Sequence, residues 1–351
     1  MKVLLTHEMF PPDFGGGGEY VVLRVTHGLR EAGVDVRVLT AGAANITTFE
    51  GIPTTRLPIS RYRFNLAVRT VLKNARDVDL IQTFSYHAVL PSLIAGRILK
   101  KPVVCYMLAF YPDLWRKLSR SPIVGQARVW WEHFLVTREY ARIIFPTQDN
   151  LDRAIAAGIR PERALLNSPA IDLELYTASQ PKEDAVLFSG KLEERKGIYD
   201  FLAVARALPH IPFRVMGSGP DEERVRRMAP PNVEFIKFER GEPLRRAFAA
   251  ARIFMLPSMG ETFGLAVLEA MASGCAVISS VPLGFRGAHI RAGDQPGMTR
   301  EVARLYGDRE LTFQMGAANV KLASQFSWSQ HIRTLLDVYS DVLGGPTNRL
   351  Q

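Results

Sequence analysis

Short β-rich runs alternate with helical segments along this chain, and that alternation constrains the fold more than any other feature. Two parallel strands need a crossover connection, which is usually a helix. Alternating strands and helices therefore predict parallel, doubly wound sheets. In the first half we expect strands at Lys2–Thr6, Val34–Thr40, Leu80–Thr83, Pro102–Met107 and Arg142–Pro146, and helices near Glu19–Ala32, Ala88–Lys100 and Ile123–Glu139.

The same pattern begins again after a polar, proline-containing stretch, Thr177–Asp184, which we interpret as a linker. A length of 351 residues suits two ordinary domains. The predicted fold is α/β, with two Rossmann-like doubly wound domains at 1–180 and 181–330, a cleft between them and a terminal segment at 331–351. The strands expected in the second half are Ala185–Ser189, Phe213–Met216, Val233–Ile236, Ile253–Leu256 and Ala276–Ser279, and the helices are Gly197–Leu208, Asp221–Met228, Pro243–Ala250 and Phe263–Ser273.

Composition narrows the class of protein. Hydrophobic residues make up 47% of the chain and charged residues 23%, a globular composition unlike that of a disordered chain. No apolar run reaches the roughly 18 residues that a membrane span needs. The first apolar stretch is too short for a secretory signal, so we expect a cytoplasmic protein. The net charge of +9 should attract polyanions, whether nucleic acid, anionic lipid or phosphorylated substrates.

Four glycines, Gly15–Gly18, follow the first expected strand and stand just ahead of the first helix. Glycines at such a turn let the backbone approach a ligand and present N–H groups to an anion. A mobile turn is the alternative, and we favour the ligand-binding turn. The spacing is not a dinucleotide fingerprint, because the third glycine would fall at Tyr20, and the turn at Met216–Glu223 fails the same test at Glu222. A nicotinamide-dependent dehydrogenase is therefore disfavoured.

Two lysines, Lys191 and Lys196, lie between the first strand of the second half and the helix that follows it. Cations at a helix amino terminus would form a site for a diphosphate, because their charge adds to that of the backbone N–H groups. Alternatively, the segment is a solvated loop in which Glu193 and Glu194 neutralise the lysines. The segment taken alone does not decide between these interpretations.

The last expected helix of the second half is apolar on every side apart from Glu269, and such a helix is buried. A buried carboxylate without partners is costly, so Glu269 needs hydrogen-bond donors. Glu261 precedes the helix, and at about 1.5 Å per residue the two carboxylates lie roughly 12 Å apart at most. Between them, the free N–H groups of Phe263, Gly264 and Leu265 form an anion site. This stretch would thus offer, in order, an acceptor for hydroxyls, a site for phosphate and a second acceptor for hydroxyls. A sugar nucleotide carries the matching groups in the same order: sugar, diphosphate and ribose.

These motifs resemble the retaining glycosyltransferases of family 4, also called group 1 glycosyltransferases, which have the GT-B fold. Glu261 and Glu269 form an E-x7-E arrangement, with PSMGETFG at the first glutamate and EAMASGCAVI at the second. FPPDFGGGGE resembles the family's amino-terminal glycine loop, with Gly16 and Gly17 as its paired glycines. SGKLEERKG resembles the phosphate segment, VMGSGPDEERV the central glycine turn, and FSWSQHIRTLLDVY the carboxy-terminal helix that crosses back to the first domain. The resemblance covers essentially the whole chain.

The resemblance implies transfer of a sugar from a nucleotide-diphosphate sugar, with retention at the anomeric carbon and without a metal or other cofactor. The first domain would be the acceptor side and the second the donor side. Lys191 and Lys196 would hold the diphosphate, Glu269 the ribose and Glu261 the transferred sugar, with Glu261 and Lys196 as catalytic residues that stabilise the developing charge electrostatically. The residues implied in donor binding are Gly16, Gly17, Lys191, Lys196, Glu261, Phe263, Gly264, Leu265 and Glu269.

The acceptor implied by the family is a hydroxyl of a sugar, a lipid-linked molecule or a small molecule. Asp77 and Asp79 superficially resemble a metal-binding pair, but they lie where a loop runs into a strand, and we expect no metal there. The two cysteines, Cys105 and Cys275, have neither zinc-site nor redox spacing and are interpreted as buried, inert thiols.

The acceptor side departs from the family pattern. Leu108 stands where the family usually has a histidine, and Gln82 and Phe84 stand where a His-x-His is common. His87 lies nearby but out of register, and we interpret it as a surface residue at a helix start. Lys191 replaces a frequent arginine, which keeps the charge but loses the bidentate fork. An intact donor half with an altered opposite face would fit an unusual sugar or acceptor, or a weakened enzyme.

The segment Phe110–Arg142 is basic and aromatic, and two interpretations are open. It could dock on an anionic bilayer that carries a lipid acceptor, which would place the protein peripherally at the inner membrane face. We expect instead an amphipathic helix that buries its tryptophans in the first domain and leaves its arginines outside. The residues concerned are Trp115, Arg116, Lys117, Arg120, Arg128, Trp130 and Trp131.

Two other functions stay open beside the transferase. A nucleotide-sugar epimerase on the same architecture would need acid–base groups around the sugar, and the missing histidines make this harder. A catalytically weak or inactive relative that only binds a nucleotide sugar is supported by Leu108 and Phe84. A nucleic-acid-binding protein ranks last, because no nucleic-acid module is recognisable.

Overall fold

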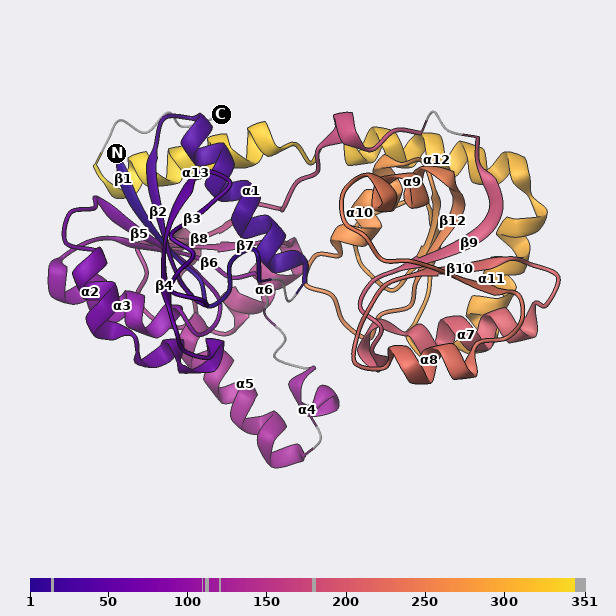
Figure 1. The fold of residues 1–351 in the computed structure, drawn as a ribbon, viewed down its shortest axis with the longest axis horizontal. Coiled ribbons are helices and arrows are strands. Elements are labelled where there is room, and N and C mark those ends of the chain that lie inside the picture. Colours follow the sequence, from indigo (N-terminus) through magenta and orange to yellow (C-terminus); the bar gives the residue numbers. More distant parts are fainter. Residues whose placement is uncertain (14–15, 109, 111–113, 120, 179–180, 345–351) are drawn as a thin grey trace. The chain divides into compact units, whose positions relative to one another are not determined.

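The structure is a computed structural model that describes residues 1–13, 16–108, 110, 114–119, 121–178 and 181–344 (Figure 1). It divides into two compact units, one formed by Met1–Pro169 with Trp328–Gln351 and the other by Ala170–Ser327. The predicted boundary at 180/181 thus lies inside the second unit. Glu183 and Asp184, which we expected in the linker, belong to the first strand of that unit.

The first unit is built on an eight-stranded sheet with the order β3-β4-β2-β1-β5-β6-β7-β8. All neighbouring strands are parallel apart from the antiparallel β3–β4 pair. The central strands are apolar along nearly their whole length, because both faces of a parallel sheet are covered. The strands are β1 Lys2–Thr6, β2 Asp35–Ala41, β3 Thr48–Phe49, β4 Ile52–Leu57, β5 Leu80–Phe84, β6 Val103–Tyr106, β7 Arg142–Phe145 and β8 Ala164–Leu166.

Helices pack on both faces of this sheet (Figure 1). The returning helix α13 lies against α1, where Gly28 is needed, because a Cβ there would come within 2.5 Å of the Ile332 side chain. Arg142 of β7 forms an ion pair with Asp341 of α13. The helices of this unit are α1 Gly17–Glu31, α2 Val68–Asn74, α3 Val89–Leu99, α4 Trp115–Leu118, α5 Pro122–Val136, α6 Gln148–Ala156 and α13 Trp328–Val342, with 3-10 helices η1 at Arg61–Leu66 and η2 at Pro161–Arg163.

The second unit is built on a six-stranded parallel sheet with the order β11-β10-β9-β12-β13-β14. Helices α7, α8 and α11 lie on one face and α9, α10 and α12 on the other (Figure 1). The strands are β9 Glu183–Ser189, β10 Phe213–Met216, β11 Val233–Ile236, β12 Ala251–Leu256, β13 Ala276–Ser279 and β14 Gly287–His289. The helices are the 3-10 helices η3 Leu173–Leu175 and η4 Glu194–Lys196 and the α-helices α7 Ile198–Ala207, α8 Glu222–Met228, α9 Glu242–Ala250, α10 Leu265–Ala272, α11 Gln295–Gly307 and α12 Arg309–Ala323.

The two parallel α/β sheets confirm the predicted fold class. β1, β10, β11 and β13 have the predicted bounds, and most other elements differ by one or two residues at an end. The last predicted helix differs in a way that matters, because α10 begins at Leu265 rather than at Phe263. The structure adds elements that the sequence did not indicate to us, among them the β3–β4 pair and the helices α11 and α12.

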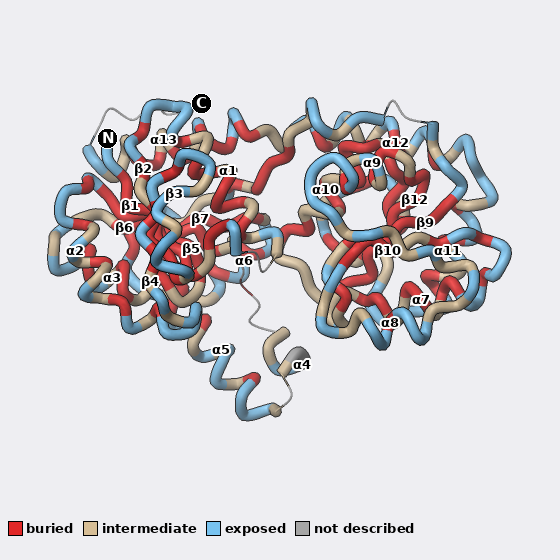
Figure 2. Tube along the Cα trace, viewed as in Figure 1, coloured by how far each residue is buried: buried red, intermediate tan, exposed pale blue. Residues whose placement is uncertain are grey.

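Our interpretation of the basic, aromatic segment is wrong on its main point. The side chain of Trp130 on α5 is 68% exposed rather than buried. Trp115 and Trp131 are intermediate. Arg120 lies outside the described residues, as does the side chain of Lys117. An apolar helix face stays exposed when no other element packs over it, and much of α5 is exposed (Figure 2).

Each unit has its own apolar core of fully buried side chains. Both cysteines, Cys105 and Cys275, are buried in these cores as free thiols. Asp77 forms an ion pair with Arg37, and Asp79 accepts a hydrogen bond from the Lys2 backbone N–H. Over the described ranges, no helix has the length and apolarity needed to cross a membrane.

Candidate active site

The predicted donor residues of the second unit gather where two adjacent strands end. β9 pairs with β12, and the chain leaves β9 toward α7 on one face and β12 toward α10 on the other. The carboxyl edge between two such strands is the topological switch point of a doubly wound sheet, where ligands bind. The site is therefore built from the β9–α7 and β12–α10 connections.

Close backbone packing fixes the first of these connections. A Cβ at Gly217 would lie 2.0 Å from the Gly190 carbonyl oxygen, and one at Gly219 would lie 2.4 Å from that of Leu192. The glycine turn after β10 therefore serves as a support for the turn after β9. Only glycine allows the two backbones to approach this closely.

Lys196 and Glu261 form an ion pair between the two connections. They are 65 positions apart in the chain, and their side chains are only 18% and 11% exposed. Each carboxylate or ammonium group removed from water needs a partner, and here each supplies the other. The sequence placed both residues in one site without indicating that they contact each other.

Arg195 joins the two connections through further hydrogen bonds. Its guanidinium donates to the Gly260 carbonyl oxygen at 3.2 Å and to Glu193 at 2.9 Å. Its own carbonyl oxygen accepts hydrogen bonds from the Met259 backbone at 2.8 Å and the Ser258 hydroxyl at 3.1 Å. Arg195 was absent from our sequence candidates, although its position beside Lys196 was a usable signal.

Lys191 is more exposed than Lys196, at 47% of its side chain, and lies 3.6 Å from Glu193. The solvated-loop interpretation therefore holds in part for Lys191, which is exposed and near a glutamate of its own loop. It does not hold for Lys196, which pairs with Glu261 from the β12–α10 connection. Lys196 is the better placed of the two cations, because exposed ion pairs are screened by water.

Gly197 follows Lys196 and is the N-cap residue of α7, with a left-handed backbone at φ 75°. A Cβ there would lie 2.1 Å from the Pro257 carbonyl oxygen, and backbone cannot move aside cheaply. We predict that Gly197→Ala destabilises the second unit by about 3 kcal/mol, combining left-handed strain with overpacking.

Gly293→Ala is the matched control, since Gly293 has φ 83° in the same unit with nothing within 4 Å of the added atom. It should lose only about 1 kcal/mol. Urea unfolding measures both variants, and equal losses would contradict the close contact with Pro257.

The amino end of α10 lies next to Glu261 in the chain. Gly264 is the N-cap residue, with φ 89°, and an added Cβ would lie 2.8 Å from the Val281 side chain. Because the helix begins at Leu265, the N–H groups of the first turn are those of Leu265 and its successors. Phe263 lies before the helix, and its buried ring packs edge-on to Phe326 at 5.7 Å. This corrects the predicted helix start.

Glu269 lies one turn further along α10, on a face that is only partly buried. The Tyr176 hydroxyl donates a hydrogen bond to its Oε1 at 2.7 Å. Burial raises the pKa of Glu269 from its usual 4.5 to about 7, against the opposing effects of the Tyr176 hydrogen bond and the Arg240 charge. The predicted all-round burial of the helix is wrong for this face, which holds Leu265, Ala266 and Glu269 at intermediate exposure.

In the first unit, Gly16 and Gly17 stand at the start of α1. The Gly16 N–H donates to Glu19 Oε2 at 2.7 Å, so this backbone group already has a carboxylate partner. Gly15 lies outside the described residues. The contact of Gly16 and Gly17 with a donor stays a prediction, as does the cleft between the domains.

The positions where the family has histidines are occupied by packed side chains. Gln82 is buried and accepts a hydrogen bond from the Tyr339 hydroxyl at 3.1 Å. Phe84 is buried with its ring edge-on to His7 at 5.9 Å. Leu108 lies against Gly18 of α1, 3.6 Å from the place of an added Cβ. Gln82 and Phe84 are therefore part of the core, whereas Leu108 is only partly buried.

His87 belongs to a polar cluster at the carboxyl ends of β1 and β5. Its Nδ1 accepts a hydrogen bond from the Asn65 amide at 2.8 Å, and the Tyr62 ring lies edge-on at 5.3 Å. The Glu8 carboxylate accepts hydrogen bonds from the backbone N–H groups of Tyr86 and His87, both at 3.3 Å. Desolvation lowers the pKa of His87 from its usual value, which favours the neutral imidazole. The sequence interpretation of His87 as a surface residue missed this cluster.

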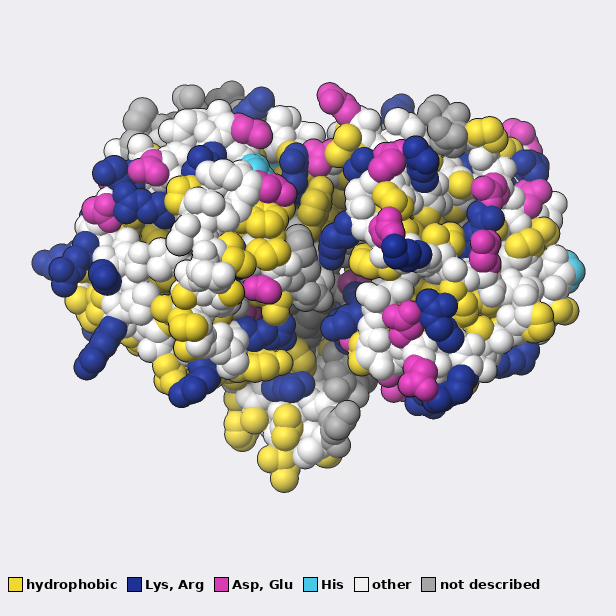
Figure 3. Space-filling view, in the orientation of Figure 1, with side chains coloured by type: hydrophobic (Ala, Val, Ile, Leu, Met, Phe, Trp, Pro, Cys, Tyr) yellow, Lys and Arg dark blue, Asp and Glu magenta, His cyan; other side chains and the backbone are white. Residues whose placement is uncertain are grey.

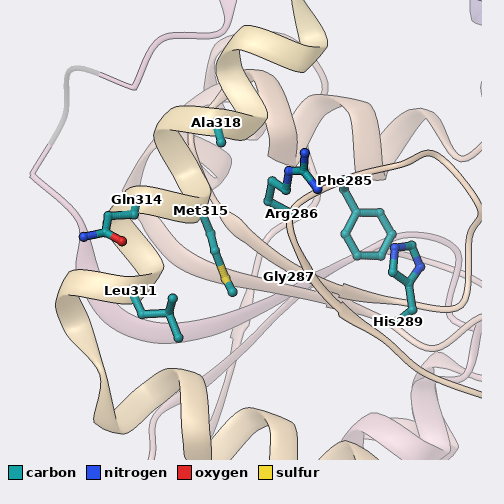
Figure 4. A pocket seen from close by; sticks show the side chains of 8 residues that line it. All are labelled: Phe285, Arg286, Gly287, His289, Leu311, Gln314, Met315 and Ala318. Carbon is teal, nitrogen blue, oxygen red and sulfur yellow. The ribbon is translucent and has the colours of Figure 1, made fainter.

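A separate hollow of about 400 Å³ lies between β14 and α12 (Figure 4). The Phe285 and His289 rings stack at 4.2 Å on one side of it. None of the predicted donor residues lines this hollow. Throughout the described ranges, no group of three or more His, Cys, Asp or Glu side chains is placed to hold a metal ion.

Two parallel α/β units of this topology define a GT-B architecture. Residues 183–308 match the family model of the group 1 glycosyl transferases, and residues 16–170 match that of the glycosyl transferase 4-like domain. These ranges together cover well over half of the chain. The chain belongs to the group 1 glycosyltransferases, enzymes of family 4 that transfer a sugar from a nucleotide sugar with retention.

Individual relatives are more distant. The chain is 26% identical to phosphatidyl-myo-inositol mannosyltransferase of Mycobacterium leprae, over 94% of each chain. It is 22% identical to alpha-maltose-1-phosphate synthase of Mycolicibacterium smegmatis, over 97% of this chain and 100% of the other. Among solved structures, Anabaena Alr3699/HepE in complex with UDP-glucose has a TM-score of 0.79 at 20% identity, covering 97% of this chain and 100% of that one. Similarity to a solved structure at this level of identity shows a shared fold.

Proposed function

We propose that the second unit binds the diphosphate of the donor at the carboxyl edge between β9 and β12, with Lys196 and Glu261 at the reacting end. The ion pair between these two residues carries the proposal. It brings a cation and a hydrogen-bond acceptor together at the switch point of the sheet. An ammonium group has three N–H donors, so Lys196 can keep Glu261 and bind a phosphate oxygen at once.

The chemistry that this arrangement supports is electrostatic. Negative charge grows on the diphosphate as the bond to the sugar breaks. Lys196, the more exposed Lys191 and the amino end of α10 at Gly264 and Leu265 supply positive charge for it without a metal. Glu261 is held beside Lys196 by this ion pair, where its carboxylate oxygens can accept hydrogen bonds from sugar hydroxyls.

Glu269 is proposed to accept the ribose hydroxyls. Its carboxylate has one hydrogen-bond donor in this structure, the Tyr176 hydroxyl, among the contacts described. Two ribose hydroxyls would add donors to a group whose burial now favours the protonated form. Ribose binding and ionisation of Glu269 are thereby coupled.

The acceptor is proposed to be a hydroxyl bound by the first unit, carried by a sugar, a lipid-linked molecule or a small molecule. Several relatives carry inositol in their names, either as phosphatidyl-myo-inositol or as D-inositol 3-phosphate. The polar cluster of Glu8, Asn65 and His87 offers hydrogen-bonding groups suited to such a polyol. We also propose a cytoplasmic location with peripheral contact to the membrane.

Thermal-shift measurements with UDP, GDP, ADP and dTDP test the donor site. We expect one nucleoside diphosphate at 100 times its Kd to stabilise the protein by about 2.7 kcal/mol. For a unit of this size that is a rise in Tm of about 5 °C or more. The matching nucleoside monophosphate should give a smaller rise, because it lacks the phosphate that Lys196 would bind.

Equal shifts with mono- and diphosphates, or none with all four nucleotides, would contradict the proposed site. Hydrolysis of the matching nucleotide sugar distinguishes an active transferase from a relative that only binds its donor. Slow hydrolysis would indicate an active enzyme, and its absence would favour the binding-only relative. Formation of an epimer without any acceptor present would favour the epimerase.

A further inference from the structure

Helix α5 exposes a continuous line of apolar side chains. Ile123, Trp130 and Phe134 are 81%, 68% and 37% exposed, and Ala127 between them is also exposed. These positions are four, three and four residues apart, which places them on one face of a helix. Large apolar side chains gathered in this way on a surface usually mark a binding site.

The rest of the helix is held in place, so this line faces away from the unit. Glu132, Leu135 and Val136 are buried at the carboxyl end of α5. At the other end α4 crosses closely, because a Cβ at Gly125 would lie 2.8 Å from the Trp115 carbonyl oxygen. The amino end of α5 projects from the first unit together with α4 (Figure 1), and hydrophobic side chains gather along it (Figure 3).

The exposed charges around this line are mostly positive. Arg116, Arg128 and Arg138 are exposed beside it. In the described part of 114–139, the carboxylates are Glu132, which is buried and accepts a hydrogen bond from the Tyr86 hydroxyl at 2.5 Å, and Glu139, which is exposed next to Arg138. The exposed surface of this segment therefore combines apolar groups with an excess of positive charge.

The guanidinium groups lie directly against the aromatic rings. Arg138 stands over the Phe134 ring at 4.2 Å, and Arg128 stands over the Trp115 ring at 5.1 Å. Aromatic rings and adjacent cations fit the boundary of a bilayer, where rings lie among the upper acyl chains and cations reach the lipid phosphates. An occupant with anionic groups beside an apolar layer satisfies both features at once.

We propose that the α4–α5 segment docks on an anionic lipid bilayer, with Ile123, Ala127, Trp130 and Phe134 entering the interface and the arginines contacting lipid phosphates. The net charge of +9 adds long-range attraction to such a surface. The proposal is independent of the donor site, which lies in the second unit. It would bring the enzyme to acceptors carried in the membrane.

Cosedimentation with vesicles tests the proposal. The full chain should bind vesicles of equal parts phosphatidylglycerol and phosphatidylcholine, and bind pure phosphatidylcholine far less. Ile123→Ser/Trp130→Ser should lower the partition coefficient for anionic vesicles about tenfold or more, because buried apolar area drives interfacial binding. Arg128→Gln/Arg138→Gln should lower binding to anionic vesicles and reduce its dependence on salt.

Ile94→Ser/Ile98→Ser is the matched control. These residues are 36% and 60% exposed on α3 of the same unit, and the variant should bind like the wild type. Wild-type binding by the α5 variant would overturn the proposal, as would failure of the unaltered protein to bind anionic vesicles. If the wild type is a dimer that does not bind vesicles, and the α5 variant is a monomer, the occupant of this face is instead a second copy of the chain. Nucleotide calorimetry on the α5 variant should match the wild type, so failure here is distinguishable from failure of the donor site.

Discussion

Lys196→Ala should weaken binding of the matching nucleoside diphosphate about 100-fold, which corresponds to roughly 2.7 kcal/mol. The reason is the loss of a cation that is only 18% exposed and held in place by Glu261. Charge-assisted hydrogen bonds in such partly dry surroundings are stronger than those between neutral groups. Isothermal titration calorimetry measures the loss directly.

Lys237→Ala is the matched control, because Lys237 also pairs with a glutamate of the second unit, Glu239, but is 85% exposed. It should bind nucleotide like the wild type. Lys196→Arg should recover part of the affinity through charge alone. Wild-type affinity in Lys196→Ala would refute the assignment of the diphosphate site.

Glu261→Gln separates the two members of the pair. It removes the partner of Lys196 but not the cation, so binding of a nucleoside diphosphate without sugar should change little. Binding of the nucleotide sugar should weaken more, because the proposed acceptor for the sugar hydroxyls has lost its charge. Equal effects on both ligands would show that Glu261 acts only by positioning Lys196.

Glu269→Gln should make the ligand-free protein more stable at pH 8 and weaken its binding of nucleotide. Burial raises the pKa of Glu269 to about 7, above the usual value for a glutamate in an unfolded chain. The folded state therefore holds a proton that the unfolded state has released between pH 4.5 and 7, so stability falls as pH rises through that window. The free energy of unfolding lost across this window is at most about 3 kcal/mol.

Glutamine keeps an acceptor for the Tyr176 hydroxyl and carries no charge. The gain in Tm should therefore be present at pH 8 and absent at pH 4.5, where the glutamate is protonated in the folded protein. A Tm difference that does not depend on pH would contradict a titration of Glu269.

The affinity of the wild type for nucleotide sugar should fall as pH drops below about 7, because the protonated carboxyl is a weaker acceptor. A nucleotide sugar is the suitable ligand, since it lacks the second phosphate ionisation of a free diphosphate. Glu269→Gln should bind about 10- to 100-fold more weakly at pH 8 and show no such pH dependence, through loss of charged hydrogen bonds. A 2′,3′-dideoxyribose analogue should bind the wild type and the variant equally if Glu269 contacts the ribose.

The polar cluster in the first unit shows how an interpretation based on neighbouring sequence positions can fail. His87 stands at the start of a helix, where a histidine is usually solvent-exposed. In the fold, β1 and β5 lie side by side, so Glu8 after one strand meets His87 after the other. Nothing near His87 in the chain indicates Glu8, because parallel neighbours are joined through a long crossover.

The sequence by itself determined the two parallel α/β sheets, because the period of apolar residues differs between strand and helix and can be read locally. It also determined the candidate residues Glu261 and Glu269, which are close in the sequence: one lies in the β12–α10 connection and the other in the helix that follows it. Only the tertiary structure decided that Lys196 contacts Glu261 and that Trp130 faces outward. Both facts depend on which elements become neighbours. Lys196 meets Glu261 because β9 and β12 are adjacent in the sheet. Trp130 faces outward because no element among the described residues covers that face of α5. Burial and long-range pairing are properties of the packed chain, and a local pattern specifies only which residues could take part in them.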